Sequence, residues 1–306
     1  MERTQESQRL LQSSYTPRRV ELERRSYFER HEDRHLDTQG DVAEIFHENS
    51  KYTQNVSQKL GRSAGLFETD EFQWSVAQHD PQYPAAPTVA LPEPESLDHS
   101  LAAALLERRT VRSYGSDPVD LSSLSTLLRY GCGQSASVSI SLDDGSEVTR
   151  NFRTYPSGGA LYPVEVYVAA FDCAGLSPGV YHYEPSGHRL RRLSTGGDDF
   201  ESAVADLITS PTDVVDVTDG SALIALTGAF GRAKAKYGPR GYRFTLQESG
   251  HLAQNLQLVA PATGIEAALL GSFDDYETDD LLGIDGVEEG SVYTLLIGTS
   301  QREGSR

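Results

Sequence analysis

Cysteine is scarce in this sequence. The chain of 306 residues has two, Cys132 and Cys173, and neither belongs to a C-x-x-C pair. Two isolated thiols cannot build a metal site by themselves, and the sequence contains no H-E-x-x-H motif or zinc ribbon. We therefore expect no metal centre. We interpret both cysteines as reduced, buried, small apolar residues, with a catalytic thiol as the alternative.

Lysine is also scarce. Only four of the 27 basic residues are lysines, namely Lys51, Lys59, Lys234 and Lys236, and the formal net charge is −18. Such an acidic surface repels nucleic acid, so the sequence disfavours nucleic-acid binding. An acidic, lysine-poor surface is typical of proteins dissolved in concentrated salt, although an ordinary acidic protein from a GC-rich genome has the same composition. Because lysine is a rare choice here, each lysine is a candidate for a specific role.

Long apolar runs are missing as well. A membrane span needs about 18 or more consecutive apolar residues, and no such stretch occurs. Residues 1–25 are polar and charged, without the apolar core of a secretory signal. The sequence therefore predicts a cytoplasmic protein that does not cross a membrane.

Proline is concentrated in one segment, residues 76–97. Its prolines preclude a regular helix and predict an extended linker. They are Pro81, Pro84, Pro87, Pro92 and Pro94. We place the main domain boundary here, between an N-terminal extension or small accessory module (1–75) and a main domain (98–306). In the extension, Ser7–Gln12 and Val42–Phe46 could form short helices.

The main domain alternates between helical and strand patterns. Helical periodicity is found over Ser100–Arg108, from Asp120 as a cap to Gly131 as a stop, over Phe200–Ile208, over Tyr242–Thr263 with Gly264 as a stop, and over Thr278–Leu282. Strands are expected at Val164–Phe171, Val180–Tyr183, Arg189–Leu193, Leu223–Thr227, Ala267–Leu270 and Val292–Ile297. Residues 134–151 are expected to form a loop or a short hairpin. The pattern predicts an α+β fold with helices packed on one mixed sheet.

Three guanidinium groups and a hydroxyl follow the first of these helices. They belong to Arg108, Arg109, Thr110 and Arg112, in the segment ERRTVRSY. Arginine donates two parallel charge-assisted hydrogen bonds to paired oxygens, so such a cluster is suited to a phosphate. The alternative is a solvated helix end whose cations favour the helix dipole.

Two glycine-containing turns adjoin predicted strands. Pro156, Ser157 and Gly158 open the segment PSGGALYP before the strand at Val164, where small residues would let a flat ligand approach the backbone. Gly271 and Ser272 follow the strand at Ala267–Leu270 and could expose backbone N–H groups. Each turn alone is also compatible with an ordinary connection. No G-x-G-x-x-G motif follows a strand, so a dinucleotide-binding domain is not indicated.

Half of the lysines lie in one short segment. Lys234, Lys236 and Tyr237 occur together between a predicted strand and the long helix. A lysine acts as a general base only when its pKa falls towards neutrality, which burial and a neighbouring cation both promote. Lys234, Arg232 and Arg240 could supply that positive charge. The alternative is a solvent-exposed basic loop.

Together these segments resemble the nitroreductase-like FMN flavoproteins and, more narrowly, the SagB-type dehydrogenases. The resemblance covers about residues 98–300 and rests on the order and spacing of ERRTVRSY, TYPSGGALYPVEVYV, KYGPRGYRFTLQESGHLAQNLQLVAPATG and LLGSFDDYETDDLLGID. The segment FHENSKYT at 46–53 is similar to the N-terminal part of the same group. The resemblance implies a nitroreductase-like fold and a homodimer with FMN at the subunit interface.

The resemblance also implies roles for individual residues. The FMN phosphate and ribityl chain would be held by Arg108, Arg109, Thr110 and Arg112. The flavin would be lined from the other subunit by Pro156, Ser157 and Gly158, and a backbone N–H near flavin N5 would come from Gly271 and Ser272. The base would be Lys236 with Tyr237. At the C-terminus, where the wider group often has basic residues on the phosphate, Arg302 is the one candidate.

The implied activity is oxidation of thiazolines and oxazolines to thiazoles and oxazoles in ribosomally made peptides, beside a cyclodehydratase. The expected partners are an azoline-containing precursor peptide and the cyclodehydratase complex. Two alternatives remain: a nicotinamide-dependent nitro- or quinone reductase of the same fold, and a mainly structural subunit of a cyclodehydratase complex. The lysine–tyrosine pair favours azoline oxidation over a nitro- or quinone-reductase activity, because hydride transfer to a nitro group needs no lysine base.

Overall fold

The computed structural model describes residues 42–52, 69–77 and 82–301. The chain divides into two compact units, Met1–Asn49 and Ser50–Arg306. In the first unit, helix α2 (Val42–Asn49) covers the helix expected at Val42–Phe46. The helix expected at Ser7–Gln12 and the candidate Arg302 lie outside the described residues. The domain boundary at residues 76–97 stays a prediction.

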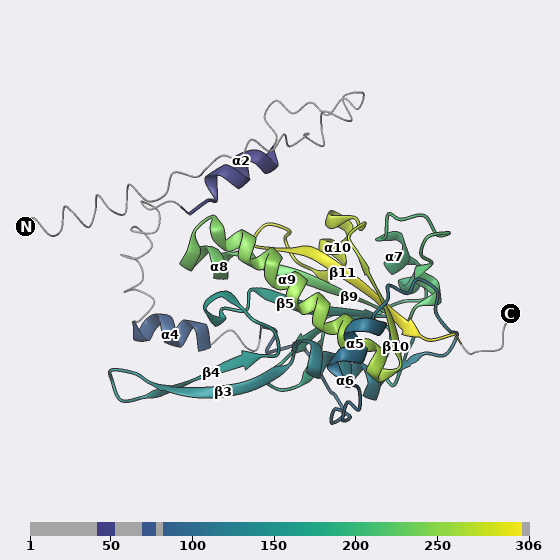
Figure 1. Cartoon of the computed structure of the whole chain (residues 1–306), viewed down its shortest axis with the longest axis horizontal. Coiled ribbons are helices and arrows are strands. Elements are labelled where there is room, and N and C mark those ends of the chain that lie inside the picture. Colours follow the sequence, from purple (N-terminus) through teal and green to yellow (C-terminus); the bar gives the residue numbers. More distant parts are fainter. Residues whose placement is uncertain (1–41, 53–68, 78–81, 302–306) are drawn as a thin grey trace, which may run out of the picture. The chain divides into compact units, whose positions relative to one another are not determined.

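The second unit is built on a seven-stranded sheet (Figure 1). In spatial order its strands are β1 (Thr88–Ala90), β8 (Arg189–Arg192), β7 (Gly179–Glu184), β5 (Val164–Ala170), β9 (Ala222–Ala229), β11 (Glu289–Thr299) and β10 (Ile265–Leu270). Neighbouring strands of this sheet pair antiparallel. Among the described strands, the parallel pair is β2 (Val119–Asp120) with β6 (Cys173–Ala174).

Helices cover both faces of the sheet. On one face, α6 (Leu121–Cys132), α9 (Arg240–Val259) and the 3₁₀ turn η4 (Ala260–Thr263) pack on residues such as Val166, Val168 and Ile224. On the other face, α7 (Phe200–Asp206) and α10 (Asp275–Leu282) pack on residues such as Tyr167, Ala169 and Leu223. The residues that pack on the two faces alternate along β5 and β9, because successive side chains of a strand point to opposite faces. The α+β fold expected from the sequence is confirmed. The main sheet is antiparallel and not mixed as expected, because residue periodicity does not show strand direction.

The remaining elements lie around this core. They are α4 (Asp70–Ala77), α5 (Leu101–Glu107), α8 (Phe230–Tyr237), β3 (Gln134–Ser141), β4 (Glu147–Arg153) and the 3₁₀ turns η2 (Gly158–Ala160) and η3 (Val217–Asp219). Strands β3 and β4 form a separate antiparallel hairpin that extends away from the main sheet (Figure 1). Residues 134–153 are therefore a hairpin much longer than the sequence indicated.

Several local predictions are confirmed. Ser100 caps α5 by accepting a hydrogen bond from the backbone N–H of Ala103 at 3.1 Å. Asp120 caps α6 by accepting from the backbone N–H groups of Ser122 and Ser123, both at 2.9 Å. These contacts satisfy donors that the first helical turn leaves without partners. Gly264 ends η4 with a φ of 73°, as its place in the sequence predicted.

The expected stop of α6 at Gly131 is wrong. The helix continues to Cys132, and Gly131 is buried inside it. A Cβ at Gly131 would lie 2.4 Å from Leu256 Cδ2, so the glycine is required by the close approach of α6 to α9. A glycine near the end of a helical pattern signals either a terminus or a tight packing point, and the sequence does not separate the two.

The basic loop expected around Lys234 and Lys236 is also not a loop. Residues Phe230–Tyr237 form helix α8, and Gly238, with a φ of 58°, ends it. Both lysines lie in its last turn, where cations are favoured by the helix dipole.

Both cysteines behave as expected, since Cys132 and Cys173 are free and buried. Burial raises the pKa of each thiol to about 12, which disfavours a reactive thiolate. Among the described helices, none is both long and apolar enough to cross a lipid bilayer.

Candidate active site

Two of the predicted segments meet at one end of the main sheet, and a third lies towards that end. Val164, at the start of β5, pairs with Gly228 near the end of β9. The turn before β5 and helix α8 after β9 therefore lie at the same end. Strand β10 runs in the same direction as β9, because both are antiparallel to β11 between them. Gly271 and Ser272, which follow β10, thus lie towards this end as well.

The turn before β5 is conformationally strained. Gly159, Ala160 and Tyr162 have φ values of 67°, 50° and 45°, a left-handed conformation that residues with a side chain rarely adopt. The turn is held by a hydrogen bond of 2.9 Å from the backbone N–H of Tyr162 to Ser157 Oγ. Strain of this kind is common at functional sites.

Lys236 and Tyr237 lie against this turn in the same chain. A Cβ added to Gly159 would be 2.8 Å from Lys236 Nζ and 2.7 Å from the Tyr237 hydroxyl oxygen. A Cβ on Gly158 would be 3.6 Å from Tyr237 Cε2. The two glycines therefore leave the space in which the lysine and tyrosine side chains reach the backbone of the turn.

A buried ion pair fixes α8 to the turn. Arg232, one helical turn before Lys236, donates a hydrogen bond of 2.9 Å to the carbonyl oxygen of Tyr162 and forms an ion pair with Glu165. Glu165 also contacts His182 Nε2 at 2.9 Å, and the two residues are only 3% and 1% exposed. Burial alone would raise the pKa of the Glu165 carboxyl, but Arg232 and His182 hold it well below its usual range.

Arg150 reaches the same place from strand β4. Its Nη2 donates a hydrogen bond to the carbonyl oxygen of Gly159. Burial lowers the pKa of Lys236, and the charge of Arg150 lowers it further. Burial raises the pKa of Tyr237, while Arg150 opposes that effect. The cation that acts on Lys236 is therefore Arg150, in place of the nearby basic residues that the sequence suggested.

Those other basic residues have different surroundings. Arg232 is paired with Glu165. The guanidinium of Arg240 lies 5.1 Å from the ring centre of Tyr52 and 5.8 Å from that of Phe244. Lys234 is exposed, so water screens its charge more effectively.

A second buried carboxyl lies behind the turn. Glu248 of α9 is 2% exposed. Burial raises its pKa to about 7, although the Ser157 hydroxyl and Arg153 favour the charged form. Glu248 therefore holds a proton more readily than an ordinary glutamate does.

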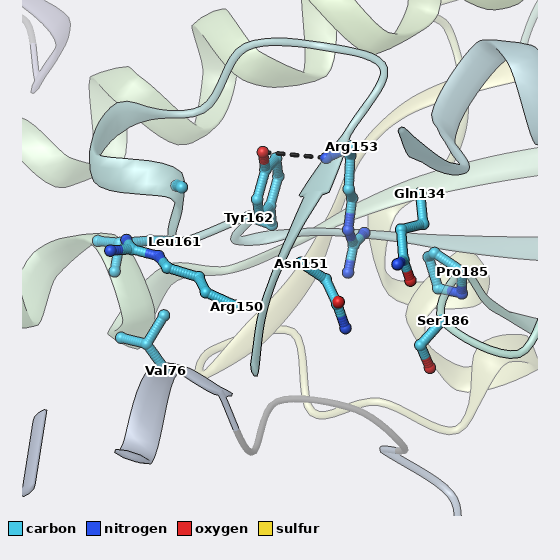
Figure 2. A pocket seen from close by; sticks show the side chains of 10 residues that line it. Val76, Gln134, Arg150, Asn151, Arg153, Leu161, Tyr162, Pro185 and Ser186 are labelled. Carbon is cyan, nitrogen blue, oxygen red and sulfur yellow. Dashed lines mark hydrogen bonds between the residues drawn. The ribbon is translucent and has the colours of Figure 1, made fainter. Parts of the chain in front are cut away.

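A small cavity borders the turn on the side of the hairpin (Figure 2). Its volume is about 40 Å³, and its lining is Val76, Gln134, Arg150, Asn151, Arg153, Ala160, Leu161, Tyr162, Pro185 and Ser186. The Tyr162 hydroxyl accepts a hydrogen bond of 3.0 Å from the backbone N–H of Arg153 across this region. Cofactor sites usually have volumes of roughly 300 Å³ or more, so this cavity has room for water or one small polar group but not for a flavin ring.

The arginine segment is in a different environment. Its backbone is tied to the edge strand β10 by a hydrogen bond of 3.1 Å from the Val111 N–H to the Ala267 carbonyl oxygen. The side chain of Arg109 donates to two carbonyl oxygens nearby, those of Leu106 and Arg108, at 2.8 and 2.9 Å. Within the described ranges, no acidic side chain pairs with the guanidinium of Arg108, Arg109 or Arg112. Thr110 is exposed beside them.

Gly271 borders open space. A Cβ placed on it would have no atom within 4 Å. Ser272 is held by its neighbours: its carbonyl oxygen accepts from the Thr209 N–H at 3.0 Å, and its hydroxyl lies 2.5 Å from that of Ser210. This turn can present its backbone to a flat ligand.

The structure thus forms two groups of candidate residues. Pro156, Ser157 and Gly158 lie with Lys236 and Tyr237, whereas the arginine segment lies along β10, the strand that Gly271 and Ser272 follow. Sequence reasoning missed Arg150, Gly159, Arg232 as a clamp, and the Glu165–His182 pair. Only Gly159 carried a local signal, as the second glycine of the turn. In the part of the chain that the structure describes, no cluster of three or more His, Cys, Asp or Glu side chains is arranged to hold a metal ion.

Comparison with known proteins assigns this chain to a family. Residues 105–299 match the nitroreductase family. The match covers more than half of the chain, so the chain belongs to the nitroreductase family. The protein MJ1384 of Methanocaldococcus jannaschii, named as a nitroreductase, is 33% identical over 196 residues, which is 64% of this chain and 89% of that protein.

Two further relatives support the narrower SagB-type assignment. The microcin B17-processing protein McbC of Escherichia coli is 30% identical over 139 residues, and the trifolitoxin-processing protein TfxB of Rhizobium leguminosarum is 31% identical over 150 residues. The matches span 49% of McbC and 39% of TfxB. The chain therefore matches half or less of the length of these two relatives.

Solved structures show the same fold. A nitroreductase-family structure from Anabaena variabilis matches 84% of this chain and 46% of its own, with a TM-score of 0.59 and 25% identity. The E. coli microcin synthetase McbBCD complex, with truncated pro-MccB17 bound, matches 73% of this chain and 81% of its own, with a TM-score of 0.51 and 24% identity.

Proposed function

We propose that this protein is an FMN-dependent dehydrogenase that oxidises thiazolines or oxazolines in a peptide to thiazoles or oxazoles. The observation that carries the proposal is the juxtaposition of Lys236 and Tyr237 with the strained glycine turn at the end of the sheet. A lysine with a lowered pKa in such a place is suited to removing a proton from carbon. The peptide-processing relatives support a peptide as the substrate.

The residues present are compatible with FMN. Arg108, Arg109 and Arg112 offer guanidinium groups without acidic partners among the described residues, which suits a phosphate. Gly271 borders open space, so its backbone can approach a flat ring. When bound, FMN would accept the two electrons that leave the substrate. The turn at 156–158 would line the ring, in a homodimer as the family resemblance implies.

The protein residues would then handle the proton. Lys236 Nζ removes the proton from the ring Cα as the hydride departs from Cβ, so the azoline loses one proton and one hydride and becomes aromatic. Tyr237, whose raised pKa keeps it protonated, orients the ring or shares the proton. The clamp formed by Arg232 and Glu165 keeps α8, and with it the base, against the turn.

The partners proposed are an azoline-containing precursor peptide and a cyclodehydratase complex in the cytoplasm. The fold shared with a chain of the McbBCD complex supports a subunit of such an assembly. The similarity to MJ1384 favours one alternative, a nicotinamide-dependent nitro- or quinone reductase of the same fold.

Two assays separate these functions. The FMN-loaded protein is mixed with a thiazoline-bearing peptide in air, and mass spectrometry follows the loss of two hydrogen atoms from the peptide. In parallel, the flavin absorbance is followed after anaerobic mixing with NADPH. We expect dehydrogenation of the peptide and slow reduction by NADPH. Rapid reduction of the flavin by NADPH, with no change in the mass of the peptide, would contradict the proposal and support the nicotinamide-dependent reductase.

A further inference from the structure

The β3–β4 hairpin is a separate sheet, yet its base is anchored beside the glycine turn. The backbone N–H of Thr154 donates to the Gly133 carbonyl oxygen at 3.0 Å, and the backbone N–H of Arg153 donates to the Tyr162 hydroxyl at 3.0 Å. These bonds fix the end of β4 against the turn. Arg150, three residues before Arg153 on the same strand, is thereby placed within reach of Gly159.

Arg150 lies there as a cation that has no counter-ion in the described part of the chain. Its Nη2 is bound to the Gly159 carbonyl oxygen, and its Nε is buried without a hydrogen-bond partner. Among the described residues, no carboxylate forms an ion pair with it. Figure 2 shows its side chain extending along the wall of the small cavity. No carboxylate of the described residues therefore neutralises its positive charge at the place where Lys236 Nζ approaches the same glycine.

Other groups of the described residues also lie around Lys236. From α4, the Phe72 ring centre is 5.9 Å from Lys236 Nζ, and on α8 the Tyr237 ring centre is 5.6 Å away. These rings contribute no full charge. Charged groups also lie on the elements around Lys236. On α4, Asp70 accepts a hydrogen bond from the Asp143 N–H, and Glu71 is exposed. On α8, Arg232 pairs with Glu165 and Lys234 is exposed, while Arg240 of α9 lies over Tyr52 and Phe244.

We propose that Arg150 is a positioning residue of this active site, which holds Gly159 against Lys236 and keeps the Lys236 amine in its neutral, basic form. A cation beside an amine disfavours a second positive charge, and partial burial strengthens the effect. The lowered pKa of Lys236 agrees with this arrangement. The hairpin thus contributes an element of the site that the glycine turn and α8 do not supply.

The catalytic consequence rests on the proposed function, but the protonation of Lys236 can be measured without turnover. The FMN-loaded wild type, Arg150→Gln, Arg150→Lys and the control Lys234→Gln are labelled with trace acetic anhydride at a series of pH values. Mass spectrometry gives the fraction of Lys236 that is acetylated. Lys234→Gln removes a positive charge from the same helix turn but not the contact with Gly159.

We expect Arg150→Gln to shift the labelling midpoint of Lys236 to higher pH, so that its acetylation near neutral pH falls severalfold. In Arg150→Lys, which keeps the positive charge, the midpoint should lie close to the wild-type value. In Lys234→Gln the midpoint should equal the wild-type value. An unchanged midpoint in Arg150→Gln, or an equal shift in Lys234→Gln, would overturn the proposal. Circular dichroism and retained flavin absorbance show that each variant is folded.

Azoline oxidation gives an independent readout. If the proposed function holds, the acidic limb of the pH–rate profile of Arg150→Gln moves in the same direction as the labelling midpoint. If the labelling shifts while no variant, including the wild type, oxidises an azoline peptide, the role of Arg150 stands and the proposed function fails.

Discussion

The two groups of candidate residues differ in whether their charged side chains are bound by other groups of the protein. Around Lys236, charged groups are engaged: Arg232 binds Glu165 and the Tyr162 carbonyl, and Arg150 binds the Gly159 carbonyl. In the segment 108–112, the guanidinium groups have no acidic partners among the described residues, and Arg109 contacts only carbonyls of neighbouring residues. One group is held in place by protein contacts, and the other is open for a ligand.

This difference agrees with two different functions, general-base catalysis and phosphate binding. A general base must be held at a fixed distance and with a tuned pKa, and this requires surrounding contacts. A phosphate-binding group keeps its donors available until the anion arrives, because internal partners would compete with it. We therefore expect changes in the first group to alter stability and rate, and changes in the second to alter cofactor affinity.

The largest expected effect comes from the clamp beneath α8. Arg232→Met leaves Glu165 buried without its guanidinium, and removing one partner of a buried ion pair typically costs about 3–5 kcal/mol. We expect the free energy of unfolding, measured by urea denaturation, to fall by about that amount, with a loss of activity. The double variant Arg232→Met/Glu165→Gln should recover part of the stability. If Arg232→Met were as stable as the wild type, buried charge would not hold this half of the site.

A smaller effect is expected in the arginine segment. Arg112 is exposed and near the proposed phosphate, so Arg112→Ala should leave unfolding unchanged. A hydrogen bond to a charged group contributes about 1.5–3 kcal/mol, so we expect FMN to bind at least tenfold more weakly. Titration of FMN fluorescence measures this affinity, with Arg192→Ala, on strand β8, as the matched control. Equal weakening in both variants would point to net charge rather than a phosphate site.

The smallest of these expected free-energy changes separates strain from contact at the glycine turn. Gly159 and Gly145 both have positive φ values, 67° and 81°, so an alanine at either costs about 1–2 kcal/mol. Only at Gly159 would the new Cβ meet Lys236 and Tyr237, since nothing lies within 4 Å of a Cβ at Gly145. We expect similar losses of stability, but a loss of activity in Gly159→Ala alone. Equal activities would remove the turn from the site.

The sequence predicted most elements of the fold because their signals are local. The cap at Asp120, the apolar run of β5 and the stop at Gly264 each depend on residues close in the chain. Gly131 was misread because its partner, Leu256, is distant in sequence. The helix around Lys236 was missed because it is short and its buried residues are only Phe230 and Ala233, which give a weak helical pattern.

The candidate site was only partly predictable for the same reason. Arg108–Arg112, Lys236 and Tyr237 could be singled out by residue type and family resemblance, and their roles stay predictions. Arg150 could not, because it reaches Gly159 through a long hairpin whose sequence indicated only a loop or a short hairpin. Its influence on Lys236 depends on tertiary contacts that sequence spacing does not contain.

The central claim is that Lys236 is the base. The most direct test mixes the FMN-loaded protein with a thiazoline peptide without oxygen and follows the bleaching of the flavin in a single turnover. We predict that Lys234→Ala bleaches at the rate of the wild type. Lys236→Ala should retain FMN but bleach more slowly by about 10²–10⁴-fold, the usual contribution of a positioned base. Bleaching of Lys236→Ala at the wild-type rate would contradict the account.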